Sequence, residues 1–161
     1  MNGGMLPALL AAAAFALALA NVGGMVRFRA LGLFAAAAVI SAFVPLPPSW
    51  SDAVHLACWV SIVACGGAVY APQVLGSRLG LVLAMAAGAA AGAVIALAST
   101  PAMAALLPAV AAITALIGHT VARRLPIAPK IVASWLIAVA LLATMLQMLP
   151  LTPGYRPDHL E

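Results

Sequence analysis

The stretch GLVLAMAAGAAAGAVIALA, residues 80–98, contains no charged or polar side chain. A helix needs about 20 mostly apolar residues to cross the hydrocarbon core of a bilayer, so this run is typical of a transmembrane helix. The same criterion divides the whole chain at its Pro, Gly and Arg residues into six apolar segments: residues 5–22, 30–44, 53–71, 80–98, 102–122 and 131–149. Backbone polar groups inside a bilayer must be paired within the protein, so each segment is expected to be a helix. The sequence therefore predicts an all-α polytopic integral membrane protein with six transmembrane helices in a single transmembrane domain, residues 1–161.

The amino-acid composition supports this fold class. Hydrophobic residues make up 66% of the 161 residues and charged residues 6%, whereas soluble domains carry about a quarter charged residues. The net charge of +4 raises the question of nucleic acid, but the basic residues form no patch with interleaved aromatic residues. We therefore expect the lipid bilayer as a partner, and no nucleic acid.

The positions of the basic residues predict an orientation. Six of the seven lie in the connections that follow the odd-numbered helices: Arg27, Arg29, Arg78, Arg123, Arg124 and Lys130. The positive-inside rule assigns these connections to the cytoplasmic side. Both termini are then expected on the outer side of a bacterial inner (cytoplasmic) membrane.

The first apolar segment, residues 5–22, has two interpretations. Ala18 and Ala20 precede Asn21 as in a signal-peptidase site, but no Lys or Arg precedes the apolar run, as one does in a secretory signal. The first basic residues follow the run, which favours a retained helix over a cleaved signal peptide.

Small residues recur every four positions along residues 80–98, at Gly80, Ala84, Gly88, Gly92 and Ala96. Such a ridge lets two membrane helices approach closely, either within one chain or between copies. Gly66 and Gly67 of the preceding helix are the expected partner within the chain. Pro108 is expected to kink the helix over 102–122.

One segment combines a histidine with the two cysteines: His55, Cys58 and Cys65 share one face of a helix over 53–71. Cys58 and Cys65 are about 10 Å apart along such a helix, so they can neither form a disulfide nor bind one metal ion together. His55 and Cys58 remain weak candidates for a metal, with Asp52, Asp158 or His159 as further ligands. The alternative is two buried, apolar cysteines and an interfacial histidine. No cofactor is expected.

No catalytic residue set is visible, and no charged residue is predicted in the middle of a helix, so we do not expect an enzyme. The first functional hypothesis is a small permease that moves an apolar or amphipathic solute. Its path would be lined by the sparse polar residues His55, Cys58, Ser61, Cys65, Thr114, Ser134, Thr144 and Gln147. The alternative is a non-catalytic subunit or assembly factor of a larger membrane complex. A homo-oligomer is compatible with the first hypothesis and a larger complex with the second.

Residues 59–149 resemble one membrane half of the fusaric-acid-resistance and aromatic-acid exporter family. The resemblance rests on Trp59 near the start of a helix, on Pro72 at its end, and on Arg78 before the GAAAG motif, Gly88–Gly92. It implies an inner-membrane exporter built of six-helix halves. Residues 1–161 are expected to form one such half, without a segment that resembles the cytoplasmic domain of those exporters.

Overall fold

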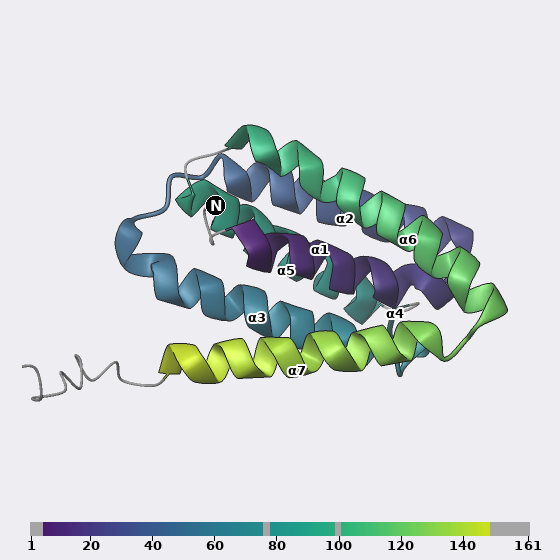
Figure 1. Ribbon diagram of the computed structural model, residues 1–161. Helices are drawn as coiled ribbons and strands as arrows, with labels where there is room; N and C mark the ends of the chain where they lie inside the picture. Colours follow the sequence, from purple (N-terminus) through teal and green to yellow (C-terminus); the bar gives the residue numbers. More distant parts are fainter. Residues whose placement is uncertain (1–4, 76–77, 99–100, 149–161) are drawn as a thin grey trace, which may run out of the picture.

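The computed structural model describes residues 5–75, 78–98 and 101–148, and within these residues it contains helices and no strand. Figure 1 shows the helices running back and forth, with turns at alternate ends of the bundle. In chain order they are α1 (Leu6–Ala18), η2 (Leu19–Asn21), α2 (Gly24–Ala42), η3 (Pro48–Trp50), α3 (Ser51–Ala68), α4 (Pro72–Leu75), α5 (Arg78–Leu97), η4 (Pro101–Ala105), α6 (Leu106–Arg124) and α7 (Ala128–Met148).

Within the described residues, five helical segments are long and apolar enough to cross a membrane: Gly24–Ala42, Pro48–Ala68, Arg78–Leu97, Met103–Arg124 and Ala128–Met148. The remaining apolar helix, Leu6–Ala18, is shorter. The chain is thus an all-helical protein whose long apolar helices are those of a membrane protein.

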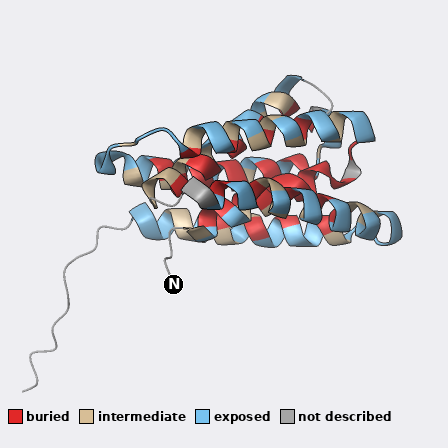
Figure 2. Ribbon diagram, turned by 90° about the horizontal axis from the view of Figure 1, so that it is seen from above, coloured by how far each residue is buried: buried red, intermediate tan, exposed pale blue. Residues whose placement is uncertain are grey.

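The short helix α1 lies at the centre of the bundle. Figure 1 shows it between α2 and α6 on one side and α3 and α7 on the other, and it also contacts α5. Nine of its 13 residues are buried, and Figure 2 shows the buried positions concentrated on the inner helices. Helix α1, whose sequence is compatible with a retained helix or with a cleaved signal peptide, is therefore packed in the core of the structure.

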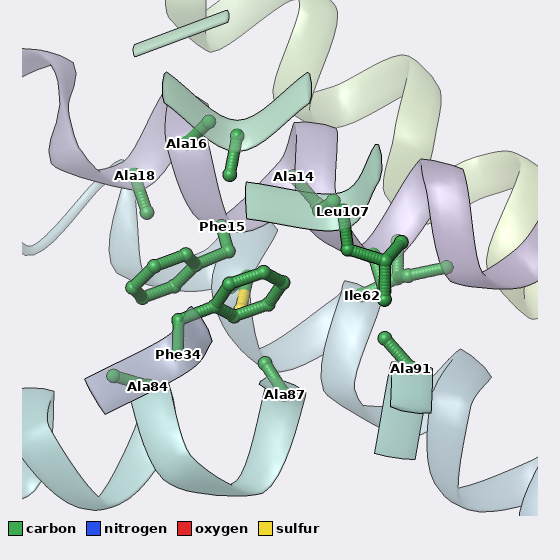
Figure 3. Packing of buried hydrophobic residues seen from close by; sticks show 14 of the residues in the cluster. Ala14, Phe15, Ala16, Ala18, Phe34, Ile62, Ala84, Ala87, Ala91 and Leu107 are labelled. Carbon is green, nitrogen blue, oxygen red and sulfur yellow. The ribbon is translucent and has the colours of Figure 1, made fainter. Parts of the chain in front are cut away.

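The core combines small side chains with one aromatic pair. Phe15 of α1 stacks on Phe34 of α2, with ring centroids 4.8 Å apart and ring planes 10° from parallel (Figure 3). Ala84 and Ala87 of α5 lie on one side of this pair, and both are fully buried. Stacked aromatic rings add about 0.5–1.5 kcal/mol beyond the burial of their surface.

The pair α2–α5 is packed so closely that two glycines of α5, Gly88 and Gly92, touch the backbone of α2. A Cβ atom at Gly88 would lie 3.1 Å from the carbonyl carbon of Phe34, and one at Gly92 would lie 2.9 Å from that of Ala38. Ser41 Oγ then joins the helices by donating a hydrogen bond to the Ala89 carbonyl oxygen, at 3.0 Å. Close contact through small residues with an interhelical hydrogen bond is the usual way in which membrane helices associate.

Two details differ from the sequence prediction. The second helix begins at Gly24, not at residue 30, so Arg27 and Arg29 lie inside its first two turns. Hydropathy marks the part of a helix that suits hydrocarbon, whereas a helix can continue beyond it because long Arg side chains reach the interface. The helix type also changes just before Pro108: η4 is a 3-10 helix, and Pro108 lies in the first turn of α6, where no intrahelical N–H bond is lost. The kink expected at Pro108 stays a prediction.

Candidate functional site

Three polar residues of α3, namely Cys58, Ser61 and Cys65, face the interior of the bundle. Cys58 and Cys65 are free cysteines and fully buried. Ser61, between them, is also buried, and its Oγ donates to the Cys58 carbonyl oxygen at 2.7 Å. His55 is half-buried, and its Nδ1 donates to the Ser51 carbonyl oxygen at 2.8 Å. The side chains of His55 and Ser61 are therefore hydrogen-bonded to the backbone of their own helix.

The described residues contain no group of three or more His, Cys, Asp or Glu side chains that could hold a metal ion. His55 and Cys58 therefore have no third metal ligand beside them among the described residues. Asp52 lies on the same helix but does not complete such a group. Asp158 and His159, the other ligands considered from the sequence, lie outside the described residues.

Of the remaining polar residues expected to line a path, Gln147 lies near a polar residue of α3, Asp52, and the others are not shown to do so. Ser134 Oγ donates to the Ile131 carbonyl oxygen and Thr144 Oγ1 to that of Ala140, each at 2.8 Å within α7. Thr114 borders an apolar hollow of about 150 Å³ between α1, α6 and α7. Gln147 borders a different hollow of about 420 Å³, at the end of the bundle where α3 begins, together with Asp52, Ala53, Leu56 and Met148.

The small residues of α5 contact several partners rather than one. Gly88 and Gly92 pack on α2, and a Cβ atom at Gly80 would meet the backbone of Leu75 in α4. Ala84 is fully buried, whereas Ala96 is half-buried. The partner suggested from the sequence is wrong: Gly66 faces Ile137 of α7, and Gly67 has no atom near its Cβ position.

The six basic residues of the connections lie at one end of the bundle (Figure 1), because α2, α5 and α7 begin there and α6 ends there. His119 of α6 lies near them, but its contact is with Arg27 rather than with Arg123 or Arg124. Its Nδ1 is 3.0 Å from Arg27 Nη2 and 3.0 Å from the Ala20 carbonyl oxygen. The only carboxylate among the described residues, Asp52, lies at the opposite end.

The sequence reading also missed a row of small residues on the outer face of α3. Beyond Asp52 in its first turn, the exposed positions of this helix recur at intervals of four and three residues and are small except for Val60: Ala53, Ala57, Val60, Ala64 and Gly67. Beside them, α3 and α5 enclose a shallow hollow of about 390 Å³, lined by Ala64, Gly67, Ala68, Ala71, Leu79, Val82, Leu83 and Ala86. The spacing was present in the sequence, but an Ala-rich chain has such rows on nearly every helix.

Comparison with models of known protein families, with curated proteins and with solved structures found no match for this chain.

Proposed function

We propose that this protein is a non-catalytic membrane subunit that receives a transmembrane helix of a partner protein along the outer face of α3. The observation that supports it is the contrast between α3 and the other outer helices. The exposed face of α3 is mainly Ala and Gly, whereas α7 exposes large side chains of the kind that face lipid: Ile131, Trp135, Leu142 and Met145, each 60–63% exposed.

Small side chains matter here because apolar surface does not by itself drive helices together in lipid. Helix association in a bilayer depends on close packing, and small residues at intervals of three or four allow it. The hollow beside Ala64 and Gly67 offers room for the side chains of an incoming helix. Gly67, with no atom within 4 Å of its Cβ position, leaves the backbone of α3 open to direct contact.

This subunit role is tested with a photo-crosslinking residue at position 67 in native membranes, and with the same residue at Ala138 on the exposed face of α7 as a control. We expect one discrete adduct from position 67, none from position 138, and loss of the adduct in Ala64→Leu. Ala64 is exposed, so this variant should fold. An adduct of two copies of this chain, or equal adducts from both positions, would overturn the role.

A permease is the second candidate, and one observation favours it. Helices α6 and α7 diverge from their short connection (Figure 1), and the apolar hollow of about 150 Å³ lies where they meet α1. Thr114, one of the residues expected to line a path, borders it. Expression of the protein should then change cellular accumulation of amphipathic compounds, and Thr114→Trp should abolish the change. Unchanged accumulation across a panel of toxic compounds would refute this function.

For the placement in the membrane, we infer six spans with the basic end of the bundle in the cytoplasm and both termini outside, in a bacterial inner membrane. At 1.5–2.0 Å per residue, α1 and η2 extend about 25 Å, less than the hydrocarbon core of about 30 Å. Because other helices surround α1, it need not match the lipid thickness as an exposed helix would. Alkaline phosphatase fused after residue 161 should be active and green fluorescent protein at the same position dark. The reverse result would refute this orientation.

A further inference from the structure

A hollow of about 310 Å³ opens at the basic end of the bundle, between the connection of α1 to α2 and the last turns of α6. It is lined by Ala20, Val22, Gly23, His119, Ala122 and Arg123. Two of these residues, Val22 and His119, are in contact with Arg27, whose Nη2 donates to the Val22 carbonyl oxygen at 2.8 Å. His119 and Arg123 therefore line the hollow, and Arg27 lies behind it, in contact with two of the lining residues.

The hydrogen bonds of this cluster are incomplete. Arg27 Nε is buried without a hydrogen-bond partner in the described part of the chain. His119 Nδ1 lies equally close to Arg27 Nη2 and to the Ala20 carbonyl oxygen. A ring nitrogen with a proton donates to the carbonyl and one without a proton accepts from the guanidinium, so Nδ1 cannot satisfy both. An anion in the hollow would face His119 and Arg123, which line it, while His119 Nδ1 donates to Ala20.

The backbone around the hollow also favours an anion. Helix α2 begins there, with Gly23 as its N-cap, no side-chain cap and no acidic residue in its first turn. The free N–H groups and partial positive charge of a helix N-terminus attract anionic groups. The α6 C-terminus carries the opposite partial charge, but Arg123 and Arg124 in its last turn compensate it.

We propose that this hollow binds the phosphate of an anionic phospholipid headgroup. The lipid is favoured as the source because the first two turns of α2, which begins at the hollow, expose large apolar side chains. Met25 and Phe28 are 70% and 74% exposed, on either side of Arg27 in the sequence, where they would contact acyl chains at the interface. Basic pockets between helix ends on the cytoplasmic side are a known form of anionic-lipid site. This lipid site is independent of the partner role of α3.

The test is native mass spectrometry of the full chain in detergent, with phosphatidylglycerol, phosphatidylcholine of the same acyl chains, or inorganic phosphate added. We expect one phosphatidylglycerol to stay bound and phosphatidylcholine to bind about tenfold more weakly. Both lipids carry a phosphate, but the quaternary ammonium of phosphatidylcholine cancels its net charge and would be repelled by the basic residues at the hollow. Arg123→Gln should lower phosphatidylglycerol binding about tenfold. Arg124→Gln removes the same charge from a residue that does not line the hollow, and should change binding less than about twofold.

A second variant separates a site from diffuse attraction. Ala122→Leu fills the hollow without altering charge, and should also reduce phosphatidylglycerol binding. Circular dichroism and thermal unfolding will verify that each variant folds. Equal losses in Arg123→Gln and Arg124→Gln with no loss in Ala122→Leu would overturn the site. Retention of inorganic phosphate but not of phosphatidylglycerol would overturn the lipid as its ligand.

Discussion

The contact between α2 and α5 gives a sharp test of the fold, through the substitution Gly92→Ala. The added Cβ would lie 2.9 Å from the Ala38 carbonyl carbon and closer still to its oxygen and to Ser41 Oγ. Backbone atoms of a helix cannot rotate away, so the two helices must separate. Overpacking of this kind costs about 1–3 kcal/mol, while replacing a helical Gly with Ala returns about 0.5–1 kcal/mol. We expect a net loss of about 1–2 kcal/mol in the free energy of unfolding.

The matched control is Gly32→Ala, which is on α2 and has no atom within 4 Å of its Cβ position. That variant should gain about 0.5–1 kcal/mol. The two variants should therefore differ by about 2 kcal/mol, or about 30-fold in the unfolding equilibrium constant. Unfolding can be followed in mixed micelles by pulse labelling of Cys58 and Cys65, which are buried in the folded protein. If Gly92→Ala were as stable as Gly32→Ala, the close approach of α2 and α5 would be refuted.

Three further outcomes are expected. Ser41→Ala should destabilise the protein by about 0.6 kcal/mol, up to about 1.7, the range for interhelical hydrogen bonds in membranes, measured by the same unfolding assay; a neutral effect would contradict the bond to α5. Phe15→Ala should cost about 3–5 kcal/mol by leaving a cavity at the centre of the core, and retention of full stability in thermal unfolding would contradict a central α1. The small apolar reagent methylmercury should react slowly with Cys58 and Cys65 but quickly with a cysteine introduced at Val60, which lies at the same depth on the exposed face of α3; equal rates would contradict the orientation of this helix.

The positions of the helices were largely predictable from the sequence. Backbone polar groups inside a bilayer must be paired within the protein, and a helix does this within its own segment. Each helix is therefore marked by its own long apolar run, with Pro, Gly or Arg at the boundaries. The exceptions arise where a helix extends past its apolar run, as at Arg27 and Arg29, or where the helix type changes, as before Pro108. Hydropathy is insensitive to both.

The central place of α1 was not predictable. In a soluble protein, a periodic apolar pattern identifies the buried face of a helix. In a membrane protein, lipid-facing and core-facing sides are both apolar, so a segment such as LPALLAAAAFALA, Leu6–Ala18, does not say which helix surrounds which. The contact of Arg27 with His119 is equally hidden, because it joins positions 92 residues apart that share only the same end of the bundle.

The four-residue spacing of small side chains in α5 carries a limited prediction. It indicates that some helix approaches closely, because only small residues permit it, but not which one. The partner α2 offers Phe34, Ala38 and Ser41 along one face, and of these only Ser41 differs from an ordinary lipid-facing residue. Two of these partner residues are apolar in a chain that is apolar nearly throughout, so the sequence could not single out α2.

For the same reason, the small residues on the outer face of α3 can be recognised as an exposed set only in the structure. In lipid, the size of a side chain separates protein-facing from lipid-facing surface, because polarity does not differ between them. An Ala-rich chain has small residues on nearly every face, so the signal is diluted in the sequence. Once the contacts within the chain account for Gly66, Gly88 and Gly92, the small residues left exposed at Ala64 and Gly67 have no partner in the described bundle. We therefore expect a leucine at Ala64 to leave folding unchanged and to act only on association with another helix.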